Sequence, residues 1–411
     1  MTTYQNKIEK LISELCPNDV KFETLEELGE LYGGLSGKSK EDFSDGNAKY
    51  ITYMNIASNI TVNIDVNTFV KVDKDEHQNK IEHGDVLFTG SSETPDEVGI
   101  SSVLTKKIDE PLYLNSFCFG FRLHDKNIFL PEFLKYLFRD DEIRKQIIKT
   151  ASGVTRFNVS KKRFVKIKIP IPPLQIQDEI VKILNNFTEL ETELETELET
   201  RKKQYEYYRE NLLAFQDDVK LVELVNIAHY SKTRISANEL NTECYVGVDN
   251  LLQNRQGKKK SDYVPKTGKF TRYEVGDILI GNIRPYLKKI WRATNTGGTN
   301  GDVLVVRINE DEKLNISSDF LYHLLASDNF FNYNMQNAKG AKMPRGNKSS
   351  IMKYKIPVPS LEEQERIVKI LDKFDALVND ISIGLPAEIK ARKQQYEYYR
   401  NKLLTFKEYV K

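Results

Sequence analysis

The sequence is poor in the residues that mark secreted, metal-binding or membrane proteins. Its three cysteines, Cys16, Cys118 and Cys244, are odd in number and widely spaced, which favours reduced thiols over a disulfide framework. The five histidines lie apart, without metal-ligand spacing to one another or to a cysteine. No segment approaches the roughly eighteen apolar residues of a membrane span, and the charged, amphipathic start lacks the apolar core of a signal peptide. We therefore expect a cytoplasmic protein without a metal site or a membrane span.

The sequence also lacks net charge and recognisable catalytic motifs. Its 61 lysines and arginines face 60 acidic residues, so no global field attracts a polyanion and any basic surface must be local. We find no nucleophile elbow, no glycine-rich cofactor fingerprint and no Asn/Asp-Pro-Pro-aromatic methyltransferase tetrad. Residues 33–39 (GGLSGKS) resemble a phosphate-binding loop, but the first glycine of that motif falls at Tyr32. The chain is predicted not to be an enzyme.

What the sequence does contain is one stretch that occurs twice. Residues 201–215 (RKKQYEYYRENLLAF) and 392–406 (RKQQYEYYRNKLLTF) are identical at 11 of 15 positions. A second pair precedes them, IPIPPLQIQDEIVKILNNF at 169–187 and IPVPSLEEQERIVKILDKF at 356–374, identical at 11 of 19 positions. Such self-similarity predicts two large units, each a variable globular segment followed by a near-constant helical one.

The two variable segments are predicted to share one α+β fold. Both contain short strand-like runs between Gly, Asn and Asp clusters, which predict mainly antiparallel sheets. The runs Gly84-Asp85-Val86-Leu87 and Gly276-Asp277-Ile278-Leu279 occupy comparable places in the two segments. The expected strands are 50–54, 69–72, 86–89, 117–123, 164–169, 245–248, 277–280 and 303–308; the expected helices outside the constant segments are 4–15, 131–149 and 318–334.

The constant segments are predicted to be long helices that pack as an antiparallel coiled coil. The first has no Gly or Pro from 176 to 215, and its centre (188–199) is three tandem TELE units. Seam positions then alternate at spacings of four and three, with Arg201 and Arg392 at one position each and apolar or aromatic residues at the others, which is an a/d seam. In the second segment, Gly384 and Pro386 should break the helix. The seam positions are Leu194, Leu198, Tyr205, Tyr208, Leu212 and Phe215, and again Leu385, Ile389, Tyr396, Tyr399, Leu403 and Phe406.

These elements predict a pseudo-two-fold arrangement of five parts. An N-terminal helix (1–20) completes the symmetry, because Asp19-Val20-Lys21 repeats at 218–220. The expected boundaries are 21–170 for the first globular domain, 171–217 for the first spacer helix, 218–357 for the second globular domain and 358–411 for the second spacer helix.

Positive charge is concentrated locally, although the whole chain is nearly neutral. Residues 143–177 hold nine lysines and arginines and no acid, and residues 331–360, in the matching place of the second unit, hold six and no acid. Local basic patches in a neutral protein are typical of phosphate contacts. The alternative for any single lysine is that it only keeps a strand soluble.

The doubled architecture resembles the specificity (S) subunit of Type I restriction–modification enzymes. The resemblance covers nearly the whole chain and rests on the two P-x-P-x-L-x-x-Q…I-V-K-I-L-x-x-F motifs, the two QYEYYR-x-x-LL-x-F helices, the TELE units, and the runs GVTRFN (153–158) and NIRPY (282–286). The family implies two target-recognition domains that each read one half of a split double-stranded DNA sequence, with the helices acting as a ruler between them. It also implies two methyltransferase (M) and two restriction (R) subunits as partners. S-adenosylmethionine, ATP and Mg²⁺ would belong to those partners, with no cofactor in this chain.

The resemblance and the basic patches together select candidate DNA contacts. Arg156 and Arg284 are expected to approach bases and the lysines mostly phosphates. The residues flanking the seam tyrosines, with 174–184 and 361–371, are candidates for M-subunit docking. The candidates are Lys38, Ser91, Arg156, Asn158, Lys161 and Lys162 in the first domain, and Asn282, Arg284, Tyr286, Lys288, Lys342, Arg345 and Lys348 in the second.

The length of the repeat carries a quantitative expectation. Each tetrapeptide adds about 6 Å of helix, which equals roughly two base-pair steps of 3.4 Å, so the number of TELE units would set the unread gap between half-sites. A second interpretation stays open: a protein-binding scaffold or inhibitory decoy that does not read DNA sequence.

Overall fold

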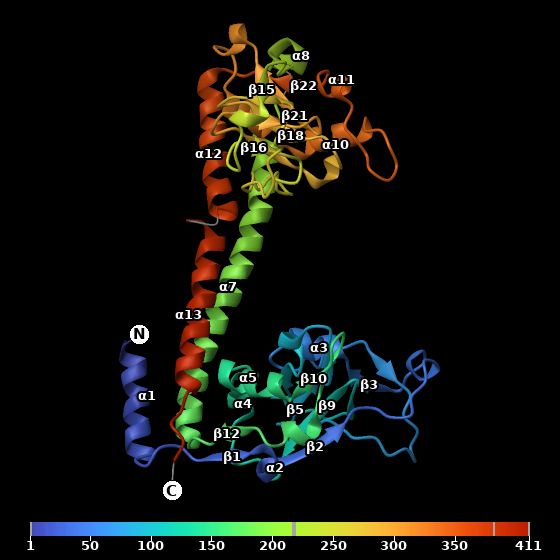
Figure 1. The fold of residues 1–411 in the computed structure, drawn as a ribbon, viewed down its shortest axis with the longest axis vertical. Helices are drawn as coiled ribbons and strands as arrows, with labels where there is room; N and C mark the ends of the chain where they lie inside the picture. Colours follow the sequence, from blue (N-terminus) through green and yellow to red (C-terminus); the bar gives the residue numbers. More distant parts are fainter. Residues whose placement is uncertain (1, 216–218, 381–382, 410–411) are drawn as a thin grey trace. The chain divides into compact units, whose positions relative to one another are not determined.

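The chain folds into two units, each with its own core. The structure is a computed structural model and describes residues 2–215, 219–380 and 383–409. Unit 1 comprises residues 1–192 and 391–411, and unit 2 comprises residues 193–390. Figure 1 draws the globular part of unit 1 in blue to teal and that of unit 2 in yellow to orange. Each unit is described separately below.

Unit 1 is built around a four-stranded antiparallel sheet. Its strand order is β2 (Gly29–Gly33), β9 (Cys118–Leu123), β5 (Val86–Thr89), β7 (Ser101–Val103). A second sheet contains β4 (Phe69–Val70), β3 (Ala48–Ile51) and β8 (Leu112–Leu114), and a third contains β10 (Ala151–Ser152), β11 (Phe157–Val159) and β6 (Ser91–Ser92). β1 (Phe22–Thr24) pairs with β12 (Lys168–Pro170). The helices are α1 (Thr2–Leu15), α2 (Leu25–Leu28), α3 (Tyr53–Ser58), α4 (Pro131–Leu137), α5 (Asp141–Thr150) and α6 (Lys161–Phe164).

Unit 2 repeats this architecture strand for strand in its central sheet. The order is β14 (Ala228–Tyr230), β21 (Val303–Ile308), β18 (Ile278–Gly281), β19 (Ile290–Arg292). The second sheet contains β15 (Arg234–Ser236), β17 (Lys269–Tyr273), β20 (Gly297–Thr299) and β16 (Tyr245–Val246), and β13 (Leu221–Glu223) pairs with β22 (Lys355–Pro357). The helices are α8 (Leu224–Ile227), α9 (Ser318–Leu325), α10 (Asp328–Gln336) and α11 (Lys348–Ile351).

The common topology confirms that the two variable segments share a mainly antiparallel α+β fold. The two strands that directly follow the Gly-Asp pair, β5 and β18, are each buried along their whole length inside the sheet. The aspartate of each motif is also buried and pairs with an arginine of the neighbouring strand: Asp85 with Arg122 at 2.7 Å, and Asp277 with Arg307 at 2.7 Å. The motif is therefore structural in both units.

The long helices follow the two constant segments. α7 spans Leu174–Leu212 without interruption, whereas the second constant segment forms α12 (Leu361–Asn379) and α13 (Leu385–Leu404). The predicted break near Gly384 is confirmed, because α13 begins one residue later and Pro386 lies in its first turn, where no backbone N–H is needed. Within unit 1, α13 runs antiparallel to α7: Phe187 stacks on Tyr399, and Glu191 pairs with Lys393 at 3.2 Å.

Three of the four seam tyrosines pack against the phenylalanine that ends the other constant motif, and the fourth, Tyr396, lies edge-on to Tyr136 of α4 with ring centroids 6.4 Å apart. Tyr205 and Tyr208 of α7 stack on Phe374 of α12 with ring centroids 6.0 and 5.2 Å apart. In unit 1, Tyr399 of α13 takes the equivalent place on Phe187. Tyr205 is only 4% exposed, while Tyr208 is 43% exposed at the edge of the contact. Leu198, Leu212 and Phe215 pack against the core of unit 2, Leu403 is buried and Phe406 half-buried in unit 1, and Leu194, Leu385 and Ile389 are half-buried.

Several expected elements differ in extent, and local caps explain most of the differences. The expected strand 50–54 ends at Ile51, because the Thr52 side chain accepts a hydrogen bond from the Asn55 backbone N–H and starts α3. The expected helices 131–149 and 318–334 are each two helices, since Asp140 caps α5 and Ser327 caps α10. The expected strand 164–169 is the end of α6 followed by β12.

Candidate nucleic-acid interface

Each unit projects one β-hairpin that directly precedes a short helix. Hairpin 1 is residues 151–159, followed by α6, and hairpin 2 is residues 338–346, followed by α11. The cross-strand pairs match, Ser152 with Asn158 and Lys339 with Arg345. Both tips contain a glycine at the same place with a positive φ, 144° at Gly153 and 97° at Gly340, a conformation that other residues rarely adopt. The hairpins are therefore equivalent elements with different sequences.

Each hairpin is attached to the continuation of the buried central strand. In unit 1, Asn158 pairs with Ser91, two residues beyond β5. In unit 2, Arg345 pairs with Ile283, two residues beyond β18. This pairing brings together residues that are far apart in the sequence, and it places the candidates Ser91, Arg156 and Asn158 in one cluster.

In unit 1 the cluster holds one arginine from two sides. The Arg156 Nε donates a hydrogen bond to the Ser91 Oγ at 3.0 Å, and its guanidinium lies 5.7 Å from the centroid of the Phe117 ring. Ser91 is 6% exposed, whereas the Phe117 ring is 61% exposed. The Asn158 Nδ2 donates to the Arg156 backbone oxygen at 3.4 Å. Phe117 is not among the residues predicted from the sequence, where its place at the start of the expected strand 117–123 was its only distinguishing feature.

The lysine candidates of unit 1 divide into two groups. Lys161 and Lys162 are exposed in the first turn of α6, immediately after hairpin 1, and the Lys161 Nζ lies 5.6 Å from the Phe119 ring. Lys38 lies elsewhere: it pairs with Glu76, and its side chain is only 8% exposed. Its charge is committed to that carboxylate in this structure.

Not every cation of the unit 1 basic run faces solvent. The Arg144 guanidinium donates to the backbone oxygens of Asp96, Val98 and Gly99, and burial lowers its pKa to about 10. Lys168 pairs with Glu408 at 2.8 Å. Arg144 therefore stabilises the fold, whereas Lys168 stays exposed in a surface ion pair, so the exposed positive charge of this run excludes Arg144.

In unit 2 the run after β18 adopts a strained conformation. Arg284 and Lys288 are left-handed, with φ of 54° and 50°, on either side of a 3₁₀ turn at Pro285–Leu287. Left-handed non-glycine residues are costly and gather at functional sites. The Arg284 backbone N–H donates to the Pro344 oxygen at 2.8 Å, which ties this run to hairpin 2. Arg284 is exposed, and Tyr286 is 49% exposed.

The remaining unit 2 candidates differ in how they are held. Lys288 pairs with Asp328 at 2.7 Å, and burial lowers the pKa of Lys288 below its usual value. Asn282 is 6% exposed, and its Oδ1 has no hydrogen-bond partner among the described residues. Arg345 pairs with Asp302 at 3.3 Å. Lys342 in hairpin 2 and Lys348 at the start of α11 are exposed.

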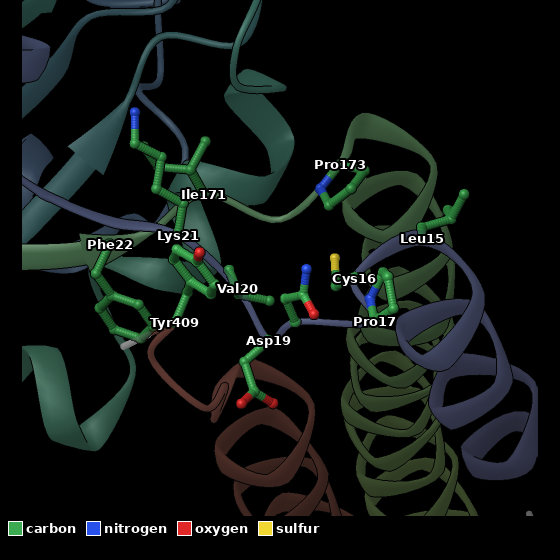
Figure 2. A pocket seen from close by; sticks show the side chains of 11 residues that line it. Leu15, Cys16, Pro17, Asp19, Val20, Lys21, Phe22, Ile171, Pro173 and Tyr409 are labelled. Carbon is green, nitrogen blue, oxygen red and sulfur yellow. The ribbon is translucent and has the colours of Figure 1, made fainter. Parts of the chain in front are cut away.

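A second equivalent feature lies where each spacer helix starts. Groove 1, of about 730 Å³, is lined by residues 15–22 with Ile171, Pro173 and Tyr409 (Figure 2). Groove 2, of about 870 Å³, lies at the matching place in unit 2 and is lined by residues 220–223, 226–227, 312, 314–315, 355 and 358–361. The first residue of each helix, Leu174 and Leu361, is exposed at 44% and 43%. An exposed leucine thus adjoins an equivalent groove in both units.

The C-terminal segment forms part of groove 1. The Val20 backbone N–H donates to the Lys407 oxygen at 2.9 Å, and the Tyr409 N–H donates to the Val20 oxygen at 2.8 Å. Figure 2 shows the Tyr409 segment beside Val20 and Lys21, with Cys16 and Pro17 near Pro173. Residues 407–409 therefore lie along the segment that joins α1 to β1.

Comparison with known proteins identifies the family. The family model for the Type I restriction modification DNA specificity domain matches residues 17–201 and again residues 216–391. The chain belongs to this family.

Relatives of this specificity chain carry the corresponding names. It is 37% identical over 276 residues to a Haemophilus influenzae protein named as a type I restriction enzyme specificity subunit, covering 62% of this chain and 68% of that one. It is 32% identical over 272 residues to the EcoR124I/EcoR124II specificity subunit of Escherichia coli, covering 59% of this chain and 63% of that one.

Solved structures support the fold of this specificity chain. A chain from a study of complex assembly and conformational transition of the type I restriction–modification system matches with a TM-score of 0.66 at 15% identity, covering 94% of this chain and 97% of that one. The S subunit of Mycoplasma genitalium matches with a TM-score of 0.51 at 15% identity, covering 94% and 96%. In the described ranges, no helix has the length and apolarity needed to cross a membrane, and no three His, Cys, Asp or Glu side chains are grouped to hold a metal ion.

Proposed function

We propose that this specificity subunit reads a split DNA sequence, with unit 1 contacting one half and unit 2 the other, and catalyses no reaction itself. The observation that carries the proposal is that two units of one fold present equivalent hairpins of different sequence, SGVTRFN at 152–158 and KGAKMPR at 339–345. A constant scaffold with two divergent tips suits two recognition modules of different specificity.

The chemistry of the hairpins suits DNA. Exposed lysines at 161, 162, 342 and 348 lie on or directly after the hairpins, where each would neutralise a phosphate and release counterions. Arg156 and Arg284 present guanidinium groups, which pair with base edges in the major groove. The lysines would thus supply affinity, and the arginines sequence preference.

The constant helices would set the gap between the half-sites. α7 passes through the TELE units as one helix, so each unit added or removed changes its length by about 6 Å, or roughly two base-pair steps. We expect the gap to depend on the number of these units.

The two equivalent grooves support docking of two copies of one partner. A surface that recurs in both units, while the hairpins differ, suits a partner that is the same on both sides. In this family context we assign that role to methyltransferase (M) subunits, which would bring S-adenosylmethionine. Two restriction (R) subunits, with ATP and Mg²⁺, would join the complex, which would act on DNA in the cytoplasm.

The proposal is tested by selecting bound duplexes from a random library with the chain and its M subunit. Wild type should enrich two short sequences at fixed spacing. Replacing Lys342, Arg345 and Lys348 by Ala should randomise one half only, and replacing Arg156, Lys161 and Lys162 by Ala the other half only. Replacing Lys74, Lys106 and Lys107 by Ala removes three exposed lysines of unit 1 that lie outside hairpin 1 and α6; it is the charge-matched control and should change neither half. Heparin binding without any enriched sequence would instead favour the scaffold interpretation.

A further inference from the structure

The residue that precedes the second strand of each central sheet occupies an equivalent position in the two units. Phe117 precedes β9 and Asp302 precedes β21. The backbone oxygen of each accepts a hydrogen bond from the residue after the central strand: from Gly90 at 2.9 Å for Phe117, and from Asn282 at 2.8 Å for Asp302. We call Phe117 and Asp302 the corner residues of their units.

Each corner residue contacts an arginine of the adjacent hairpin. The Phe117 ring lies beneath the guanidinium of Arg156, and the Asp302 carboxylate pairs with Arg345. The two contacts differ in what they leave for a ligand. Asp302 occupies a terminal nitrogen of Arg345, at 3.3 Å, whereas an aromatic ring holds a guanidinium by its face and uses none of its N–H groups.

The hydrogen bond to Arg156 also leaves its terminal nitrogens available. Ser91 accepts from Nε, the inner nitrogen, and Ser91 is itself buried and fixed by β6–β11 pairing and by the Tyr53 hydroxyl, which donates to its backbone oxygen at 3.0 Å. Within the described part of the chain, no hydrogen-bond acceptor lies on either terminal nitrogen of Arg156. A guanidinium held by its face and by Nε presents two parallel donors.

We propose that Phe117 and Ser91 are positioning residues for Arg156, and that Arg156 held in this way reads a guanine in the half-site of unit 1. The proposal rests on the proposed function. Two parallel donors match the O6 and N7 acceptors of guanine in the major groove, and no other base offers that pair of acceptors. Because the Arg156 side chain is already held in one conformation before DNA binds, less side-chain entropy is lost on binding.

The test compares guanine with 7-deazaguanine, which lacks the N7 acceptor, at each guanine of the selected unit 1 half-site. For one guanine position, wild type in complex with its M subunit should bind the unmodified duplex about tenfold more tightly than the duplex with 7-deazaguanine there, the size expected for loss of one hydrogen bond to a charged donor. R156K, which keeps the charge but not the fork, should lose this preference while keeping much of its affinity for unrelated DNA.

The positioning residues are tested by the same measurement, the ratio of affinities for the guanine and 7-deazaguanine duplexes. F117L and S91A should reduce the preference for guanine severalfold without changing discrimination in the unit 2 half-site, while F117W, which keeps an aromatic face, should retain it. F69L is the matched control, because Phe69 is an exposed phenylalanine of unit 1 that lies outside the hairpin cluster.

Two results would overturn the inference. One is a unit 1 half-site in which no guanine is sensitive to 7-deaza substitution; the other is a guanine preference that R156K abolishes but F117L and S91A both leave at the wild-type value. Neither result touches the proposed function, which fails separately if wild type enriches no split sequence.

Discussion

The glutamine of each P-x-P-x-L-x-x-Q motif should be a measurable stabilising element. Gln364 is completely buried: its Oε1 accepts from the Ser317 backbone N–H at 2.9 Å, and its Nε2 donates to the backbone oxygens of Asn315 and Pro359 at 2.8 and 2.9 Å. Gln177 makes the same three contacts in unit 1, with Leu130, Ile128 and Pro172. Each glutamine thus joins a loop that precedes a core helix to the start of a spacer helix.

Gln364→Met keeps the volume and removes all three hydrogen bonds. At about 1 kcal/mol net for each bond, unit 2 should lose roughly 3 kcal/mol of its free energy of unfolding. With a urea m-value of about 1–3 kcal/mol/M, the midpoint should fall by about 1 M or more. Gln336→Met, on the exposed side of α10, removes a solvated amide and should leave the midpoint within experimental error.

The assay is urea unfolding followed by tryptophan fluorescence. Trp291 is the only tryptophan of the chain, and it is buried in unit 2 against Tyr273, so its emission reports the unfolding of that unit. A Gln364→Met midpoint equal to that of the Gln336→Met control would refute the reasoning, since it would mean that water replaces the three bonds at no cost.

Three further predictions concern single features of the fold. Burial raises the pKa of the Cys118 thiol to about 12, so Cys118 should resist a thiol reagent at pH 8 in the native chain and react once urea unfolds it. Because only the unfolded thiol ionises near pH 9, the free energy of unfolding should fall as the pH rises above 9. Asp277→Asn leaves the Arg307 charge without its closest carboxylate and should cost unit 2 about 3 kcal/mol in the same urea assay, whereas an unchanged midpoint would contradict the structural role of the motif. Inserting a fourth TELE unit after 188–199 should lengthen the gap between the half-sites of the selected DNA by about two base pairs, with both half-site sequences unchanged. An unchanged gap would contradict the proposal that the length of α7 sets the spacing.

The duplication carried most of the fold prediction. Because the same motifs recur with near-constant spacing, the sequence predicted two units of one fold and long constant helices, and the break near Gly384 followed from Gly and Pro alone. What it missed was the role of single polar residues inside apolar runs. Thr52, Asp140 and Ser327 end one element and start another through a side-chain cap, which periodicity does not detect.

The sequence predicted which basic residues belong to the candidate site, but it did not predict how these residues are arranged in space. Basic runs located both hairpins, but only the folded chain places Ser91 beside Arg156, because strand pairing between distant segments has no local signal. The same limit applies to Lys38 and Arg144, which are basic in sequence yet bind groups of the protein itself. Phe117 was missed because an aromatic at a strand start usually belongs to the core, whereas this ring is exposed.

The most direct measurement of the central claim is methylome sequencing of cells that produce this chain with and without its neighbouring M gene. We predict adenine methylation at one split motif, present only when both are produced, with one half altered by substitutions in hairpin 1 and the other by substitutions in hairpin 2. Absence of a split motif in the presence of a demonstrably active M subunit would contradict the claim and favour the scaffold interpretation.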